Sequence, residues 1–319
     1  MPVKYLATDP TPVPLGSKVA VIAPAGPVRP ERLERGCELL RGLGLEPVLG
    51  RHLLGPVRGY LAAEDAQRAS DLEEAWADPD IRAVLCAHGG YGSVRLLDIL
   101  DWEQLAKIAA NNPPKPFVGS SDITALHRAL ALHLGVRTYY GPVVAGPILG
   151  EPSPCLQTVR SFADSLFSPG KSVNLSGGAC IVPGKAEGVT TGGTLTLLCS
   201  LAGAPEFRSA AGSIVLLEDV KESPYRIDRM LTQLVRGGWF EQARGIACGS
   251  WEDCRPAEQV VEILLDRLGG LGIPIVTGLP FGHGPTQMTV PLGAHAELDA
   301  TSGALRLRAH QPSMRDVVA

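Results

Sequence analysis

Long apolar runs and basic clusters are both missing from this sequence of 319 residues. No apolar stretch reaches the roughly 18 residues that a membrane-spanning helix needs, so we expect no association with a membrane. Residues 1–11 lack a basic segment followed by an apolar one, so we expect no signal peptide. Because the net charge is −4 and no basic stripe is interleaved with aromatic residues, we expect no binding to nucleic acid.

The cysteines do not form a pattern typical of disulfides or of a zinc site. Their number, seven, is odd, and Cys86, Cys199 and Cys248 lie inside apolar runs, which favours reduced, buried thiols in a cytoplasmic protein. Cys248 and Cys254 have no matching second pair, and neither the H-E-x-x-H motif nor a Walker loop occurs. We therefore expect neither a metal ion nor a cofactor.

Apolar runs and helical spacings alternate along the first half of the chain. Strands are predicted at 18–23, 45–49 and 81–87, and helices at 30–43 and 63–77. The strand at 81–87 is apolar almost throughout, which is typical of a parallel strand covered on both faces. This alternation predicts an α/β fold with a doubly wound parallel sheet, whose ligands bind at the carboxyl ends of the strands.

Beyond residue 149 the composition changes. Residues 150–183 are rich in Gly, Pro and Ser in two stretches, which predicts a linker and the irregular start of a second domain. Further on, regular elements are predicted in the order helix 195–201, strand 213–217, helix 224–235, strand 246–251, helix 257–268 and an antiparallel pair at 294–298 and 305–308. The expected organisation is an N-terminal extension (1–16), an N-terminal α/β domain (17–149), the linker (150–183) and a smaller C-terminal α/β domain (184–319).

The segment 115–126 (KPFVGSSDITAL) contains the most informative turn. Phe117 and Val118 lead through Gly-Ser-Ser-Asp into a helical pattern, as a strand does when it turns into a helix at the carboxyl edge of a sheet. A serine in such a turn has an exposed hydroxyl, and nearby backbone N–H groups can stabilise an oxyanion. Alternatively, Ser121 or Asp122 only caps the helix, because both residue types are favoured at N-caps.

Two positions in the second half could complete the machinery of a serine nucleophile. Glu218 follows the predicted strand 213–217, and His283 lies between two glycines. A serine hydroxyl needs a base to take its proton, and a histidine base works better when a carboxylate fixes its tautomer. Each residue also has a purely structural interpretation, Glu218 as a solvated carboxylate at a strand end and His283 as a turn residue.

The glycine cluster 89–92 (GGYG) follows the third predicted strand. It lacks the G-x-G-x-x-G spacing of dinucleotide-binding loops and does not follow the first strand. Its glycines could let the backbone approach a ligand, or supply an N–H, at the same sheet edge as Ser121. Structural glycine turns explain the cluster equally well.

Five segments, in matching order, resemble the LD-carboxypeptidases, a family of serine peptidases that includes the muramoyl-tetrapeptide carboxypeptidases and the microcin C self-immunity proteins. These segments are 61–97, 119–124 (GSSDIT), 217–220 (LEDV), 224–229 (PYRIDR) and 282–285 (GHGP). The resemblance implies a flavodoxin-like N-terminal domain and a smaller C-terminal α/β domain, with the active site at their interface.

The resemblance also implies roles for individual residues. The catalytic triad is expected at Ser121, Glu218 and His283, and Ser121 is preferred to Ser120 because the family's nucleophile directly precedes the aspartate. The implied oxyanion donors are the backbone N–H groups of Asp122 and Gly90, and the implied substrate contacts are Gly89, Tyr91 and Gly92. The chain departs from the family's usual Arg, Ser and Asn at His88, Ala25 and Thr194, respectively.

The function implied by the resemblance is that of a serine carboxypeptidase in cell-wall recycling. It would cleave the bond before a terminal D-amino acid, D-alanine, of a small peptide substrate, the murein tetrapeptide, in the cytoplasm and as a homodimer. One alternative is a microcin-C-type immunity hydrolase that cleaves an aminoacyl-nucleotide amide with the same triad. An alternative of another class is a catalytically silent ligand-binding protein on the same scaffold.

Overall fold

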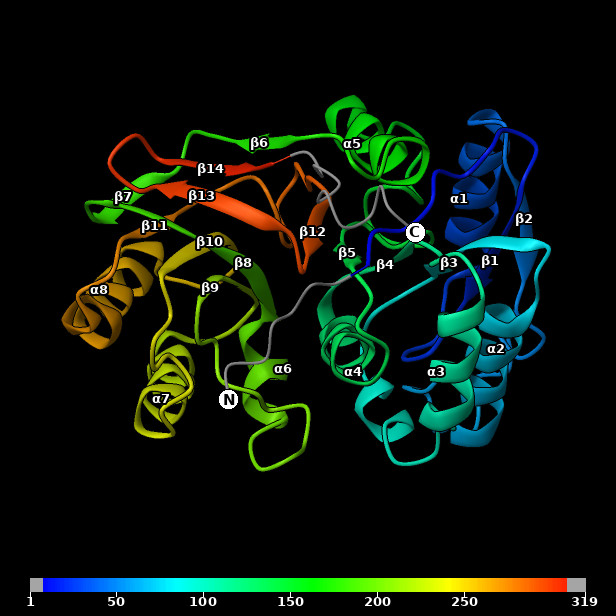
Figure 1. The fold of residues 1–319 in the computed structure, drawn as a ribbon, viewed down its shortest axis with the longest axis horizontal. Coiled ribbons are helices and arrows are strands. Elements are labelled where there is room, and N and C mark those ends of the chain that lie inside the picture. Colours follow the sequence, from blue (N-terminus) through cyan, green and yellow to red (C-terminus); the bar gives the residue numbers. More distant parts are fainter. Residues whose placement is uncertain (1–7, 309–319) are drawn as a thin grey trace, which may run out of the picture.

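The computed structural model describes residues 8–308, and two β-sheets divide it into two lobes that lie side by side (Figure 1). The expected N-terminal extension and C-terminal domain include residues 1–7 and 309–319, which lie outside the described residues. The first sheet has six strands, in the order β12-β5-β4-β3-β1-β2. These strands are β1 (Lys18–Ile22), β2 (Glu46–Leu49), β3 (Ile81–Cys86), β4 (Phe117–Gly119), β5 (Thr138–Tyr140) and β12 (Val290–Leu292).

The first five strands of this sheet pair in parallel, and their spatial order 2-1-3-4-5 is that of a flavodoxin-like sheet. The connecting helices are α1 (Pro30–Gly42), α2 (Asp65–Ala77), α3 (Trp102–Asn111), α4 (Thr124–Leu134) and α5 (Leu156–Phe167), with short 3-10 helices η1 (Ser93–Leu96) and η2 (Ser121–Ile123). The predicted parallel, doubly wound fold class is therefore confirmed.

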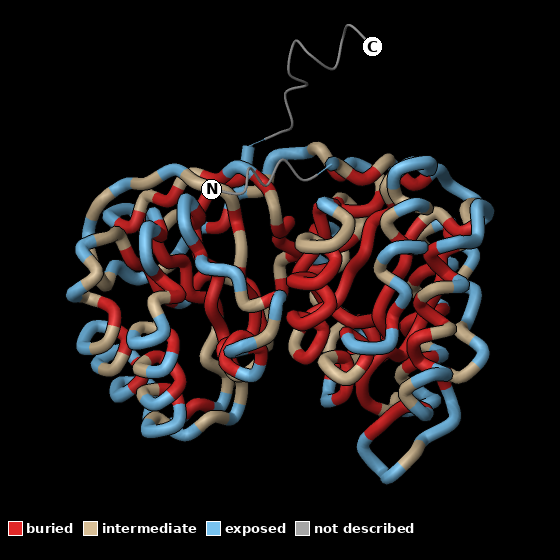
Figure 2. The backbone as a smooth tube through the Cα atoms, turned by 60° about the horizontal axis from the view of Figure 1, so that its bottom comes forward, coloured by how far each residue is buried: buried red, intermediate tan, exposed pale blue. Residues whose placement is uncertain are grey.

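Alternate residues of β1 show how both faces of this sheet are covered. Val19 and Val21 pack in a core with α1 and α5, whereas Ala20 and Ile22 pack in a second core with α2, α3 and α4. Successive side chains of a strand point to opposite faces, so an apolar run such as KVAVI is buried on both sides. The buried strands at the centre of each lobe are visible in Figure 2.

The second sheet is mixed and has eight strands, in the order β6-β14-β13-β8-β9-β10-β11-β7. Its strands are β6 (Val173–Leu175), β7 (Ala179–Val182), β8 (Lys185–Thr194), β9 (Ser213–Val220), β10 (Gly245–Glu252), β11 (Ile275–Thr277), β13 (His295–Asp299) and β14 (Ala304–Leu307). The helices of this lobe are α6 (Leu195–Ser200), α7 (Pro224–Arg236) and α8 (Ala257–Leu268), with the 3-10 helix η3 (Gly269–Leu271).

Strands β8, β9, β10 and β11 are parallel, and the outer strands are antiparallel. Helices α6, α7 and α8 cover one face, which contains Val215 and Leu217 of β9. Ile214 and Leu216 point to the other face, where they pack with residues of β12, β13 and β14. The predicted antiparallel pair at the end of the chain is confirmed as β13 and β14. Within the described residues, no helix is both long and apolar enough to cross a membrane.

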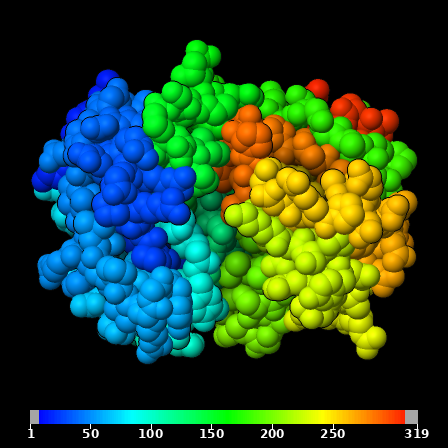
Figure 3. Space-filling model, turned by 180° about the vertical axis from the view of Figure 1, so that it is seen from behind, coloured from blue at the N-terminus to red at the C-terminus, as the bar shows by residue number. Residues whose placement is uncertain are grey.

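The two lobes exchange segments of the chain. Strand β12, from the C-terminal half, pairs antiparallel with β5 at the edge of the first sheet. Residues 150–183, expected as a linker, contain α5, which packs in a core of the first lobe, and β6 and β7, which pair with β14 and β11 of the second. Figure 3 shows the same arrangement from behind, with the green residues of this region spanning the top of both lobes.

Strand β8 is regular structure that the sequence did not predict, because residues 187–193 contain three glycines. Two of these glycines are required by close neighbours: a Cβ at Gly192 would lie 2.0 Å from the backbone oxygen of Leu216, and one at Gly193 2.5 Å from Oγ1 of Thr124. Glycine inside a strand often marks such a close approach of another segment. The apolar helix predicted after this segment is confirmed as α6.

Two glycines of α1 give a test of the packing between this helix and the loop after β5. A Cβ at Gly36 would lie 2.1 Å from the backbone oxygen of Val144, whereas a Cβ at Gly42, in the last position of the same helix, would meet no atom within 4 Å. Gly36→Ala should therefore destabilise the protein by about 1–3 kcal/mol or more, as overpacking does. Gly42→Ala should not, because alanine favours the helix. Thermal unfolding of both variants checks this, and equal melting temperatures would contradict the packing described.

Candidate active site

Ser121 lies where the chain leaves β4 and enters η2 and α4, with a backbone φ of 63°. This left-handed conformation is uncommon for a residue with a side chain and is typical of strained functional turns. Its backbone is held on both sides: the N–H donates to Oη of Tyr140 at 3.0 Å, and the C=O accepts from Oγ1 of Thr124 at 2.8 Å. The interpretation of Ser121 or Asp122 as a helix cap is wrong, because neither side chain caps η2 or α4.

The glycine cluster lies directly against this turn. A Cβ at Gly89 would be 2.8 Å from Cβ and 3.2 Å from Oγ of Ser121, so a side chain there would crowd the serine hydroxyl. The C=O of Gly89 accepts from the N–H of Gly26 at 2.8 Å, which joins the loops after β1 and β3. Gly90 has a φ of 91°, a conformation that favours glycine. The cluster therefore provides a tight turn without a side chain that would crowd Ser121, and its contact with a ligand stays a prediction.

The buried carboxylate of Asp122 connects the serine turn to the glycine loop. It accepts from the N–H of Ser93 at 2.7 Å, and Oγ of Ser93 donates to the C=O of Asp122 at 2.5 Å. The role of the Asp122 and Gly90 N–H groups as oxyanion donors stays a prediction.

Glu218 and His283 come from the second lobe, on β9 and on the loop after β11. Oε2 of Glu218 lies 2.6 Å from Nδ1 of His283. The carboxylate is completely buried, and the imidazole side chain is 21% exposed. Oε1 accepts from Oη of Tyr140 and from Oγ1 of Thr194, each at 2.6 Å. The interpretation of Glu218 as a solvated strand-end carboxylate is therefore wrong.

The pKa values of Glu218 and His283 are shifted by each other's charge in the direction opposite to the effect of burial. Burial alone would lower the pKa of His283, but the charge and hydrogen bond of Glu218, together with the charges of Asp219 and Glu252, outweigh it, and the pKa of His283 is raised. Burial likewise disfavours ionisation of Glu218, but His283, Thr194 and Tyr140 stabilise the carboxylate, and its pKa is lowered. With Nδ1 held by Glu218, the Nε2 atom is the nitrogen left to exchange a proton with a third group.

Asp219, the next residue, belongs to a different environment. Its carboxylate accepts from the N–H and Oγ1 of Thr196, at 2.9 and 2.8 Å. Burial and the nearby Glu218 raise the pKa of Asp219 to about 6. Because successive residues of a strand point to opposite sides, Asp219 cannot replace Glu218 as the partner of His283.

The structure brings Ser121 and the Glu218–His283 pair together through Tyr140, which the sequence analysis did not name. In the described part of the chain, Oγ of Ser121 makes no hydrogen bond to His283. Such contacts are often long in ligand-free sites and tighten only with substrate. The available signal for Tyr140 was chemical: a tyrosine in a short buried strand needs a partner for its hydroxyl.

The remaining expected contact residues, Tyr91 and Gly92, follow Gly90 in the loop after β3. Tyr91 is 46% exposed, and its ring centroid lies 5.9 Å from that of Tyr60. Gly92 packs closely against Leu61 and Arg68. Their contact with a substrate stays a prediction.

His88 lies between β3 and Gly89, at the position where the family resemblance led us to expect arginine. Its Nδ1 is buried and has no hydrogen-bond partner among the described residues. Burial, followed by the charges of Arg32 and Arg29, lowers the pKa of His88 and so favours its neutral form.

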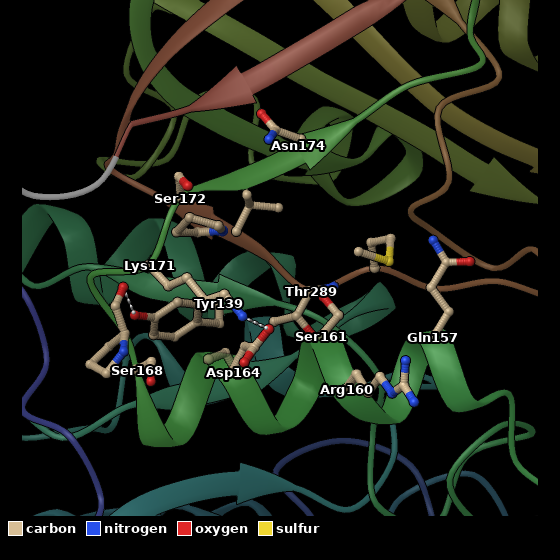
Figure 4. Close-up of a pocket in the computed structure, with 15 residues that line it drawn as sticks. Tyr139, Gln157, Arg160, Ser161, Asp164, Ser168, Lys171, Ser172, Asn174 and Thr289 are labelled. Atoms are coloured by element: carbon tan, nitrogen blue, oxygen red, sulfur yellow. Dashed lines mark hydrogen bonds and ion pairs between the residues drawn. The ribbon is translucent and has the colours of Figure 1, made fainter.

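A cavity of about 410 Å³ lies elsewhere, between α5, β6 and the segment before β12 (Figure 4). Tyr139 lines it and donates to the C=O of Pro169 at 3.1 Å, and Lys171 pairs with Asp164 across its edge. Tyr139 and Tyr140 are neighbours on β5 and point to opposite faces of the sheet. This cavity is therefore separate from the site around Ser121.

Residues 8–308 contain no group of three or more His, Cys, Asp or Glu side chains that could hold a metal ion. All seven cysteines lie within this range and are free thiols. Cys86 and Cys248 are fully buried, and burial raises the pKa of Cys248 to about 12. Such thiols are poor nucleophiles.

The protein is thus a two-lobed α/β protein with a flavodoxin-like sheet and a second, mixed sheet. Its candidate site is a serine turn that Tyr140 joins to a buried Glu–His pair of the other lobe. Residues 19–141 match the LD-carboxypeptidase N-terminal domain, and residues 187–298 match the LD-carboxypeptidase C-terminal domain. The chain belongs to the LD-carboxypeptidase family.

Individual relatives agree with this assignment over nearly the whole chain. A relative in Streptomyces coelicolor is 49% identical over 92% of this chain and 93% of its own length. The murein tetrapeptide carboxypeptidase of Pseudomonas aeruginosa is 36% identical over 92% of this chain and 96% of its own length. The crystal structure of an MccF-like protein from Bacillus anthracis superimposes with a TM-score of 0.87 at 26% identity, covering 95% of this chain and all of that one.

The raised pKa of His283 depends on the charge of Glu218, which gives a direct test. Glu218→Gln keeps the size of the side chain but removes the charge, while the burial that disfavours the imidazolium remains. The pKa of His283, followed by NMR titration of its ring, should therefore fall below its ordinary value of 6.5. In Asp219→Asn, the fall should be smaller, because that carboxylate acts on His283 through charge alone. An unchanged pKa in Glu218→Gln would contradict the pairing described.

Proposed function

We propose that the protein is a serine-type LD-carboxypeptidase that removes the terminal D-alanine from a murein tetrapeptide. The observation that carries this proposal is the strained Ser121 turn next to the buried Glu218–His283 pair, in a chain that belongs to this family. The relative named murein tetrapeptide carboxypeptidase supports the choice of substrate. We also propose that the N-terminal α/β domain ends at residue 149 and that the C-terminal α/β domain begins at residue 184.

The proposed reaction begins with proton transfer from Oγ of Ser121 to Nε2 of His283. Oγ then attacks the scissile carbonyl carbon, and the N–H groups of Asp122 and Gly90 stabilise the oxyanion that forms. Glu218 holds the tautomer that leaves Nε2 free and stabilises the imidazolium. The oxyanion then collapses and the bond between the carbonyl carbon and the nitrogen of D-alanine breaks, while His283 donates its proton to that nitrogen. D-Alanine leaves, and the acyl group stays on Ser121 as an ester.

In the second half of the reaction, a water molecule gives its proton to His283 and attacks the ester carbonyl. The oxyanion again forms beside Asp122 and Gly90. Its collapse breaks the bond to Oγ, and His283 returns the proton to Ser121. The products are the tripeptide acid and the free enzyme, so that one water molecule is consumed for each D-alanine released. No step requires a metal ion or a cofactor.

The proposed setting is the cytoplasm, where murein peptides are recycled, and the proposed state is a homodimer. Seven free thiols support a reducing compartment. The dimer rests on the family resemblance.

A second candidate is a hydrolase of aminoacyl-nucleotide amides, like the microcin C self-immunity proteins. The similarity to the MccF-like protein, at a TM-score of 0.87, favours it. The same triad would serve, because both reactions cleave a carbonyl–nitrogen bond through an acyl-enzyme. The two functions differ in the group that leaves, and so in the surfaces beyond the triad.

The choice of nucleophile predicts different outcomes for two adjacent serines. Ser121→Ala should lower kcat on murein tetrapeptide by several orders of magnitude, because the covalent step is lost. Ser120→Ala should have a much smaller effect, because Oγ of Ser120 is buried and accepts from Nε2 of Gln287 at 3.2 Å. A fluorophosphonate probe should label the Ser120→Ala variant and fail to label Ser121→Ala. Equal losses in both variants would contradict the assignment, and an unlabelled wild type would favour a silent ligand-binding protein.

The substrate can be decided by parallel incubation of the enzyme with murein tetrapeptide and with an aminoacyl-sulfamoyl adenylate. We expect release of D-alanine and tripeptide, detected by mass spectrometry, and little cleavage of the adenylate. Ser121→Ala serves as the control for contaminating hydrolases. Cleavage of the adenylate alone would select the second candidate.

A further inference from the structure

The hydroxyl of Tyr140 lies at the junction between the two lobes. Tyr140 lies on β5 of the first sheet and is 1% exposed. Its Oη atom lies 2.6 Å from Oε1 of Glu218, on β9 of the second sheet. Oη of Tyr140 also accepts from the backbone N–H of Ser121 at 3.0 Å. One phenol oxygen therefore touches both the backbone of the proposed nucleophile and the carboxylate that orients the proposed base.

The available protons fix the direction of these hydrogen bonds. An ionised carboxylate only accepts, so Tyr140 and Thr194 each direct their single proton to Oε1 of Glu218. The N–H of Ser121 can only donate, and it uses a lone pair of the phenol oxygen. Burial, and then the neighbouring Glu218, raise the pKa of Tyr140 well above its ordinary value, so the hydroxyl keeps its proton.

A second path closes these contacts into a ring. The N–H of Thr194 donates to Oγ1 of Thr124 at 3.1 Å, and Oγ1 of Thr124 donates to the C=O of Ser121 at 2.8 Å. Ser121 is thus held through its N–H by Tyr140 and through its C=O by Thr124. Both paths reach Glu218, one through the tyrosine and the other through Thr194.

We infer that Tyr140 is a positioning residue of the proposed reaction. Its hydroxyl holds the left-handed backbone of Ser121 in place and sets the basicity of the Glu218–His283 pair. This inference rests on the proposed function only in that Ser121 and His283 are taken as nucleophile and base. Tyr140 itself touches no reacting atom.

The chain provides a matched control in the adjacent residue. Tyr139 lies on the same strand, is 2% exposed, and donates one hydrogen bond to the C=O of Pro169 at 3.1 Å. Tyr139→Phe and Tyr140→Phe therefore each remove one buried hydroxyl and one donated hydrogen bond. Only Tyr140→Phe removes a donor to Glu218. Thermal unfolding of both variants should show that each is folded.

The effect on the pH profile follows from charge. Without the hydroxyl, the carboxylate of Glu218 loses a donor, so the Glu218–His283 pair binds a proton more readily. The acidic limb of kcat/KM should therefore move to higher pH in Tyr140→Phe and stay in place in Tyr139→Phe. Asp219 and Glu252, whose charges also raise the pKa of His283, are unchanged in both variants. At the pH optimum, Tyr140→Phe should lower kcat by about 10- to 100-fold, the loss expected for one hydrogen bond to a charged group, with little change in KM.

The rate of fluorophosphonate labelling of Ser121, measured against pH, separates this inference from the proposed substrate. Labelling needs an activated serine but no murein peptide, so its profile should shift in Tyr140→Phe even if the tetrapeptide is not cleaved. Failure to cleave the tetrapeptide with a shifted labelling profile would reject the substrate and support the role of Tyr140. A labelling profile in Tyr140→Phe that matches Tyr139→Phe and wild type would overturn the inference.

Discussion

The ionised carboxylate of Glu218 is the interaction on which the site depends. It is completely buried, and burial of an isolated charge strongly favours its neutral form. Three donors offset this penalty: Tyr140 from the first sheet, and Thr194 and His283 from the second. Because the donors come from both lobes, the charge is stable only while the lobes keep their relative position. The hydroxyl of Tyr140 also accepts from the backbone N–H of Ser121. The electrostatics of the Glu218–His283 pair and the conformation of the serine turn therefore depend on the same side chain.

Much of the first lobe could be predicted from the sequence, because its signals are local. Apolar runs such as 18–22 and 81–86 are strands buried on both faces, and the spacing of leucines in α1 marks its buried side. Segments whose structure depends on distant partners could not be predicted. Strand β12 has only three residues and exists because β5 offers an edge, and β8 is rich in glycine because Leu216 and Thr124 approach its backbone. The segment 150–183 contains α5, β6 and β7, which could not be predicted because the segment is rich in turn-forming residues.

The candidate site likewise contains residues that local sequence signals indicate and residues whose roles depend on distant partners. The turn at Ser121 is visible in the sequence as the end of a strand and the start of a helix, but a positive φ is not, so a helix cap remained an alternative until the backbone was known. Glu218 and His283 are 65 residues apart, and no spacing rule pairs them. Their association could be expected only from the family resemblance. Tyr140 carries no motif, and its place between Ser121 and Glu218 follows from the packing of two sheets.

The return of the chain into the first sheet makes the two halves of this protein interdependent. If residues 8–149 were produced alone, β5 would lose β12 and become the edge of the sheet, with the backbone N–H and C=O groups of Thr138 and Tyr140 exposed. Unprotected edges of this kind recruit strands from other molecules. The N-terminal half, despite its complete flavodoxin-like order of strands, should therefore aggregate unless the C-terminal half is synthesised with it. Synthesis from one end to the other leaves this edge open until residue 292 has been made, so the first sheet is completed only when β12 emerges late in synthesis.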